Sequence, residues 1–195
     1  MPMSIDMPSP LAASVAAVAE DQFNRYRQYH ETHLPLRNQI RKYWTETGFD
    51  FPDVGTPWSA VFVSWCFWKA GATKTDFPFN PQHSQFIKTF IANADAGRGA
   101  LRAYPITAQP VTVGDIIHNN RDGGTIDYAA ARTNGSYPSH TAIVVKVGTD
   151  SNGNYALTIG GNEGDTVGRR VVRLDAQGRV KPIGHYYICV VDNGL

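Results

Sequence analysis

The segment Trp58–Ala70 constrains the fold most strongly, because its apolar side chains occupy nearly every direction around a helix. Its sequence is Trp-Ser-Ala-Val-Phe-Val-Ser-Trp-Cys-Phe-Trp-Lys-Ala, and Gly71 after it is a natural helix stop. A helix that is apolar nearly all round is buried, whereas a surface helix keeps one polar face. The sequence therefore predicts a helix buried inside the core.

Three further segments show apolar side chains at helical spacing. The predicted helices run from a cap at Ser9 or Ser14 to about Thr32, over Leu36–Thr47, and over about Pro81–Ala94. The first ten residues, Met1–Pro10, contain three prolines and are expected to be a loose lead-in.

From Leu101 onward the pattern changes to short runs of β-branched and aromatic residues. Five predicted strands cover Val111–Ile117, Thr141–Val147, Tyr155–Ile159, Arg170–Leu174 and Tyr186–Val191. Asn152-Gly153 lies between two of them and is typical of a hairpin turn. Asn119–Pro138 is a long polar insertion of the kind that often forms a lid or a binding loop. Helices first and a meandering sheet afterwards predict an α+β domain.

Length and composition fit one compact unit, with a helical extension over residues 1–48 and the main domain over residues 49–195. The chain has 195 residues, of which 42% are hydrophobic, enough for a core without disulfides. The net charge is +1 and the Lys and Arg residues are scattered, so no nucleic-acid partner is expected. No run reaches the roughly 18–20 apolar residues of a membrane span.

Cys66 and Cys189 each lie in an apolar run, which favours two buried free thiols; a disulfide is the alternative. Asp115, His118 and His140 are candidate metal ligands, but no recognised metal-site spacing supports them, so neither a metal nor another cofactor is expected. The first nineteen residues lack the basic region of a secretory signal and favour a helix start. We therefore expect a soluble protein without a Sec signal.

Ser59 is the first candidate for chemistry, because it begins the buried helix. Backbone N–H groups in the first turn of a helix have no partner within the helix, and they create partial positive charge there. A nucleophile at that point is close to amides that stabilise an oxyanion. Serine is also a common helix cap. The local sequence alone favours the cap, and the nucleophile depends on partners elsewhere in the chain.

Two such partners occur later in the sequence. His140, in Ser139–Val145, begins a strongly apolar strand, and histidine serves as a general base near neutral pH. Asn162 follows the next strand among glycines, where its amide is able to orient the His140 ring. Taken singly, each has an ordinary structural explanation, as a strand-edge histidine and a turn asparagine. Their order after Ser59 is the order of papain-like enzymes.

These segments resemble the NlpC-type and CHAP-type cell-wall amidases, which share a papain-like fold. The motifs in the resemblance are Trp58–Gly71, Val113–Ile117, Ser139–Val145 and Ile159–Asn162, within residues 50–191. The chain is closer still to a poorly characterised bacterial branch whose helix opens with Trp-Ser-Ala-x-Phe. The resemblance implies N-terminal helices packed on a small antiparallel sheet or half-barrel.

In that superfamily a cysteine nucleophile begins the helix, a histidine base begins the strand, and a polar residue orients the histidine. The resemblance places these roles on Ser59, His140 and Asn162, with Glu163 as an alternative orienter. A thiol has a free pKa of about 8.5 and ionises beside a histidine. A serine hydroxyl must instead lose its proton as it attacks, although Ser-His sites do hydrolyse acyl bonds.

Other residues are assigned to the cleft. Trp58 and His83 are expected to line it, and Asp115 in Gly114-Asp115 is expected to shape the substrate site. Cys66 is an alternative nucleophile, but it lies seven residues after Ser59, two helical turns or about 10 Å deeper.

The resemblance implies a hydrolase that cleaves an amide bond of peptidoglycan or a muropeptide. The alternative is a catalytically degenerate module that binds the cell wall. Without a Sec signal, such an enzyme is expected to leave the cell by another route, as an antibacterial toxin or lysis factor acting in the periplasm or on the cell wall. A toxin implies an immunity protein as an inhibitory partner.

Overall fold

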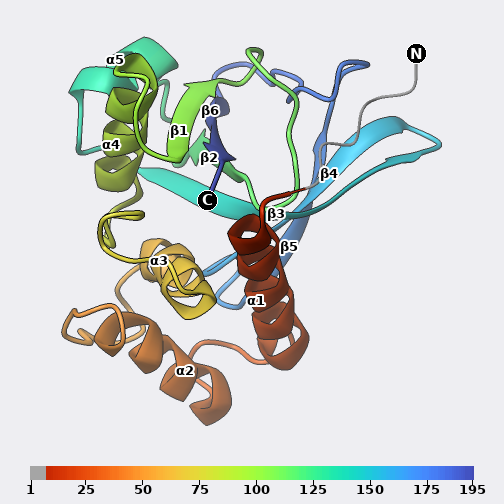
Figure 1. The fold of residues 1–195 in the computed structure, drawn as a ribbon. Helices are drawn as coiled ribbons and strands as arrows, with labels where there is room; N and C mark the ends of the chain where they lie inside the picture. Colours follow the sequence, from red (N-terminus) through yellow and green to blue (C-terminus); the bar gives the residue numbers. More distant parts are fainter. Residues whose placement is uncertain (1–7) are drawn as a thin grey trace.

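The computed structural model describes residues 8–195, which form an α+β domain (Figure 1). Five helices occur in this part of the chain: α1 (Pro10–Tyr26), α2 (Leu34–Thr45), α3 (Ser59–Ala70), α4 (His83–Asp95) and α5 (Tyr128–Thr133). Six strands accompany them: β1 (Leu101–Pro105), β2 (Ile116–Asn120), β3 (Ser139–Asp150), β4 (Gly153–Gly160), β5 (Gly168–Arg173) and β6 (Tyr187–Asn193).

The strands form one open antiparallel sheet in the order β1-β6-β2-β3-β4-β5. Its longest strands, β3 and β4, form a hairpin in which Asp150 pairs with Gly153, so the predicted hairpin is confirmed. Its two loop residues are Ser151 and Asn152, one position earlier than predicted, and Gly153 begins β4. The other end of β3 begins at Ser139, beside the end of β2, where His140 pairs with Asn119. This end of the sheet carries the residues of chemical interest.

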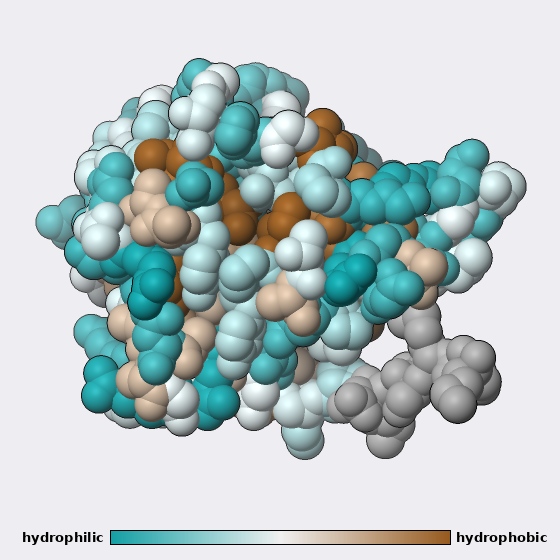
Figure 2. Space-filling view, turned by 90° about the horizontal axis from the view of Figure 1, so that it is seen from above, coloured by the Kyte–Doolittle hydropathy of each residue, from teal (hydrophilic) through white to brown (hydrophobic). Residues whose placement is uncertain are grey.

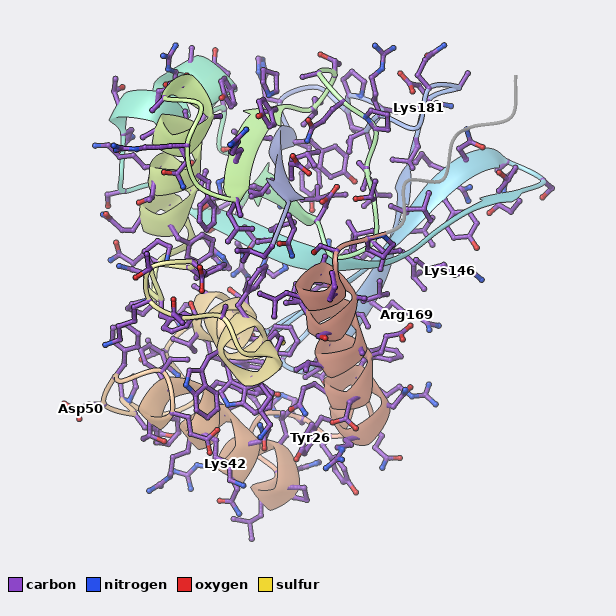
Figure 3. The ribbon with its side chains drawn as sticks, in the orientation of Figure 1. Tyr26, Lys42, Asp50, Lys146, Arg169 and Lys181 are labelled. Atoms are coloured by element: carbon purple, nitrogen blue, oxygen red, sulfur yellow. The ribbon has the colours of Figure 1, made fainter. Side chains whose placement is uncertain are left out.

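The helices cover one face of the sheet. Helix α1 lies against β3, α4 lies beside β1, and α2 packs on the outside of α3 (Figure 1). Helix α1 also contacts the far edge of the sheet, because the guanidinium of Arg169 on β5 lies 4.7 Å from the ring centre of Phe23 on α1. Figure 3 shows Arg169 beside α1. The prediction that α3 is buried is confirmed, since nine of its residues, beginning with Ser59, are buried.

Alternation along the strands separates two apolar clusters. Ile116 and Ile143 point to the helices and join the main core, whereas their neighbours Ile117 and Val144 point to the opposite face. That second face is covered by smaller apolar groups from the loops around the sheet, Val180 among them. Seen from above, apolar side chains lie in the middle of the surface with hydrophilic groups around them (Figure 2).

The predicted N-terminal extension shares its core with the rest of the chain. Val15 on α1 and Leu36, Ile40 and Tyr43 on α2 are fully buried in the same cluster as the helix α3. Residues 8–48 therefore pack as part of a continuous core.

Several predicted boundaries differ from the structure for identifiable reasons. Ser9 is the cap of α1, since its Oγ accepts from the Ala12 N–H at 3.1 Å. That helix ends at Tyr26 instead of about Thr32, because the chain turns so that the Glu31 N–H donates to the Asp165 carbonyl at 2.7 Å.

Two predictions about residues 101–138 were wrong in part. The strand expected from Val111 begins only at Ile116, because Gly114 adopts φ 94° and a Cβ there would lie 2.5 Å from the Ala12 side chain. The sequence prediction missed β1, and it missed α5, which lies inside the expected polar insertion and is capped by Asp127.

The two cysteines are free and buried, which confirms the prediction of two thiols. No helix in residues 8–195 has the length and apolar character needed to cross a bilayer. The expected lead-in Met1–Pro10 lies largely outside the described residues.

Candidate active site

Ser59 is the first residue of α3, and its hydroxyl is not a helix cap. The cap position belongs to Trp58, and the first bond of the helix runs from the Phe62 N–H to the Trp58 carbonyl at 3.0 Å. The amides of Ser59 and Ala60 therefore precede the helical ladder, at the positive end of the helix dipole. Both residues line an open cavity.

The hydroxyl of Ser59 is hydrogen-bonded to a histidine that begins another helix. Ser59 Oγ lies 2.7 Å from Nε2 of His83, the first residue of α4. The opposite ring nitrogen, Nδ1, lies 2.6 Å from Oγ1 of Thr141 on β3. Two helix starts and one strand thus form a chain of three hydrogen-bonding groups, in which the middle ring is fixed at both nitrogens.

The protonation of His83 follows from its surroundings. Burial is the main reason that the pKa of His83 lies well below its ordinary value, and the charges of His140, His118 and Arg121 lower it further. The ring is therefore neutral at pH 7 and carries a single proton. With that proton on Nδ1, donated to the Thr141 hydroxyl, Nε2 is free to accept the proton of Ser59. This tautomer is the one that general-base catalysis requires.

His140 belongs to a second hydrogen-bonded chain. Its Nε2 lies 3.0 Å from Oε1 of Glu163, and Oε2 of the same carboxylate accepts from Arg170 Nε at 2.8 Å. Burial alone would raise the pKa of Glu163, but the hydrogen bond from His140 and the nearby positive charges outweigh it, so the pKa is lowered. Because an ionised carboxylate only accepts hydrogen bonds, the proton between the two groups lies on His140 Nε2.

The two chains meet at the start of β3. His140 and Thr141 are successive strand residues, so their side chains leave the backbone in opposite directions. The rings of His83 and His140 nevertheless touch edge to face, with centres 5.5 Å apart. Ser59 therefore has His83 as its hydrogen-bonded partner, and His140 contacts the ring of His83.

Gly160 at the end of β4 and Gly161 directly after it allow this close packing. A Cβ on Gly160 would lie 2.6 Å from Glu163 Oε1 and 2.7 Å from His140 Nε2. A Cβ on Gly161 would lie 2.6 Å from Phe62 on α3. Gly160 thus leaves room for the His140–Glu163 pair, and Gly161 leaves room for the buried helix, where a side chain would collide.

Two adjoining cavities open on the site. One, of about 480 Å³, is lined by Ser59, His83 and Tyr137 among others. The other, of about 440 Å³, is lined by residues that include His140 and Glu163. Arg121 and Asp122 line both cavities, which places this short segment on the wall between them.

The remaining predicted site residues lie in different surroundings. Asn162 lines the second cavity and adopts φ 54°, but Glu163, not Asn162, contacts the His140 ring. Trp58 is fully buried and donates its indole N–H to Glu31, so it belongs to the core and not to the cleft surface.

Asp115 lies at the opposite end of β2 from the site. Its carboxylate accepts from the backbone N–H groups of Thr112 and Asn193, and burial raises its pKa to about 7. Cys66 is fully buried inside α3, and burial raises the pKa of its thiol. Neither side chain lines the two cavities.

A family model described as an uncharacterized protein conserved in bacteria, DUF2272, matches residues 37–189. The chain belongs to the DUF2272 family. No curated protein and no solved structure matches this chain.

The region matched in this DUF2272 protein contains both hydrogen-bonded chains. Ser59, His83, Thr141, His140 and Glu163 all fall inside residues 37–189. Helix α1 and the end of β6 lie outside the matched range. The site thus lies within the part of the chain that matches the family model.

The side chains of this DUF2272 protein offer no preformed metal site: residues 8–195 contain no group of three or more potential His, Cys, Asp or Glu ligands. His118, one of the candidate ligands, is fully buried and its Nε2 lies 3.0 Å from the Tyr137 hydroxyl. Sequence reasoning missed Thr141 as the partner of His83 and Arg170 as the partner of Glu163. No local pattern marks them, because their roles depend on how α4 packs on β3 and on how the chain returns into β5.

Proposed function

We propose that this protein is a hydrolase that cleaves an amide bond in peptidoglycan, with Ser59 as its nucleophile. The observation that carries the proposal is the 2.7 Å contact between Ser59 Oγ and His83 Nε2, at the start of a buried helix and on the wall of an open cavity. A nucleophile within hydrogen-bond reach of a base that a third group orients is the arrangement of acyl-transfer sites.

The proposed reaction begins with a bound amide whose carbonyl oxygen meets the N–H groups of Ser59 and Ala60. Ser59 Oγ attacks the carbonyl carbon while its proton passes to His83 Nε2. The amide C–N bond then breaks, and His83 returns that proton to the departing amine. Water then attacks the acyl carbon and gives a proton to His83 Nε2. The bond between that carbon and Ser59 Oγ breaks, the carboxylic acid leaves, and His83 returns the proton to Ser59 Oγ.

His83 takes the role of base in this proposal because it contacts Ser59 directly. The assignment of the base to His140, which follows from the resemblance to NlpC-type enzymes, stays a prediction. In the proposed scheme, His140 packs against the ring of His83. Its own imidazole is hydrogen-bonded to Glu163 and lines the second cavity. Separate substitutions of the two histidines distinguish these assignments.

The peptidoglycan part of the proposal rests on the ordered motifs that resemble cell-wall amidases. It includes action in the periplasm or on the cell wall, and inhibition by an immunity protein that fills the cleft. The two adjoining cavities support it, since a branched and extended substrate needs room on both sides of the scissile bond.

The experiment is digestion of purified sacculi, with soluble fragments measured by chromatography and mass spectrometry. Wild type is compared with Ser59→Ala, His83→Ala and His140→Ala, and all four proteins are checked for a cooperative thermal transition. Wild type alone is expected to release fragments at full rate, with the Ser59 and His83 variants the most impaired. Equal release of soluble fragments by all four proteins would contradict the mechanism.

One feature favours a second function, a module that binds muropeptides without cleaving them. The His83 ring is oriented by the neutral hydroxyl of Thr141 instead of a carboxylate, and its low pKa makes it a weak base. Such a module would retain muropeptides without turnover. A gain of hydrolysis in Ser59→Cys, with none in wild type, would establish this alternative, because a thiolate needs less help from a base.

A further inference from the structure

The wall between the two cavities is a tight turn of fixed shape. The Gly124 N–H donates to the Arg121 carbonyl at 2.9 Å, and the two central residues, Asp122 and Gly123, have φ of 54° and 73°. Positive φ at both positions defines a type I′ turn. The Arg121 N–H also donates to the Pro138 carbonyl at 3.2 Å, which ties the turn to the start of β3.

Arg121 is the cation that this turn presents to both cavities. Within residues 8–195, its guanidinium takes part in no ion pair and no hydrogen bond. The other arginine on the cavity wall, Arg170, is paired with Glu163. The carboxylate beside Arg121, that of Asp122, is exposed at the tip of the turn. Arg121 therefore retains its full capacity to bind an anion.

We propose that Arg121 binds a carboxylate of the substrate, so that the preferred substrate is a peptide with a free α-carboxylate next to the scissile amide. A guanidinium matches a carboxylate with two parallel hydrogen bonds, which gives selectivity for the acid over the corresponding amide. The inference rests on the proposed function for the bond that is broken, but the binding step is independent of turnover.

The same contact links substrate binding to His83. The charge of Arg121 is among the causes that lower the pKa of that ring. A carboxylate bound to Arg121 offsets this charge, so His83 becomes a stronger base when an acidic substrate is in place. Arg121 is thus a specificity-determining residue that also adjusts the base beside Ser59.

The experiment measures binding by calorimetry in a Ser59→Ala background, where hydrolysis does not interfere. The ligands are two muramyl tripeptides with amidated C-termini that differ at one group, the glutamyl α-carboxyl, which is free in one and a carboxamide in the other. The receptor variants are Arg121→Gln and Arg121→Lys. Arg98→Gln is the matched control, because it removes the same charge from an exposed position beyond the end of α4.

The free acid is expected to bind about tenfold more tightly than the carboxamide, which is about 1.4 kcal/mol. Arg121→Gln is expected to remove this preference, Arg121→Lys to keep part of it, and Arg98→Gln to keep all of it. Equal affinity for the two tripeptides, no binding of either one, or a preference that survives Arg121→Gln would overturn the inference.

Turnover of the same two ligands by the protein with Ser59 intact separates this inference from the proposed function. Arg121-dependent binding without any hydrolysis would support the carboxylate site and contradict the hydrolase proposal. Hydrolysis of both ligands at equal rates, unaffected by Arg121→Gln, would support the hydrolase proposal and contradict the carboxylate site.

Discussion

The hydroxyl of Ser59 lies 2.7 Å from Nε2 of His83, although the two residues are 24 positions apart and begin different helices. Both side chains are buried, with Ser59 2% exposed and His83 7% exposed. A hydrogen bond between such groups is retained only where the surrounding elements hold both in place. Here α3 positions Ser59, α4 positions His83, and Thr141 on β3 holds the ring of His83.

Thr141 is expected to matter through the ring it orients. Thr141→Val keeps the shape of the side chain but leaves His83 Nδ1 without its partner, which costs about 1–3 kcal/mol for a buried polar group. We expect a loss of about tenfold in kcat on muropeptides and a small change in KM, with recovery in Thr141→Ser. Steady-state kinetics of the three proteins test this, and equal kcat in the Val and Ser variants would contradict it.

Gly160 is expected to tolerate no side chain. Gly160→Ala introduces a Cβ within 2.7 Å of both His140 Nε2 and Glu163 Oε1, so the pair must separate or the β4 end must shift. The expected cost is about 1–3 kcal/mol in the free energy of unfolding. Gly55→Ala is the matched control, because a Cβ there meets nothing within 4 Å. Urea unfolding that is unchanged in Gly160→Ala would refute the packing argument.

His118 is expected to make stability depend on pH. Burial lowers its pKa to about 3, whereas the unfolded chain keeps the ordinary value of 6.5. Below pH 6.5 the unfolded chain therefore binds a proton that the folded protein does not bind until about pH 3. The unfolded state binds more protons in this window, so stability falls as the pH falls through it.

The measurement for His118 is urea unfolding at pH 7 and pH 5. Between pH 7 and pH 5, the free energy of unfolding is expected to fall by about 2 kcal/mol more in wild type than in His118→Phe. This follows from about 1.36 kcal/mol for each pH unit below the unfolded pKa of 6.5. Buried His83 acts in the same direction and is present in both proteins. His185→Asn, which replaces an exposed histidine, should behave like wild type. Equal losses in wild type and His118→Phe would contradict the assignment.

Local patterns in the sequence were sufficient for much of the fold. The cap at Ser9, the buried helix that Gly71 ends, and the Asn152-Gly153 hairpin each depend on neighbouring residues, and each is confirmed. The short strand β1 was missed because its pairing with β6 brings together residues far apart in the chain, such as Leu101 and Asn193. Leu101–Pro105 has little intrinsic strand signal of its own.

The sequence indicated which residues form the candidate site, but it did not indicate the hydrogen bonds between them. Ser59, His83 and His140 were all assigned to the cleft, yet nothing local indicates that the Ser59 hydroxyl meets His83. The choice between Asn162 and Glu163 depends on one backbone conformation. Asn162 takes up φ 54°, and the chain then returns so that Glu163 contacts His140. Such contacts follow from tertiary packing, which residue patterns do not encode.

The central claim is that Ser59 and His83 form a nucleophile–base pair. The most direct measurement is the rate at which a fluorophosphonate, a probe that reacts with activated serines, labels the protein, with the labelled residue located by peptide mass spectrometry. Wild type should be labelled at Ser59, and the rate should fall about a hundredfold or more in His83→Ala, as expected for loss of a general base. An unlabelled Ser59 in wild type, or an unchanged rate in His83→Ala, would contradict the account.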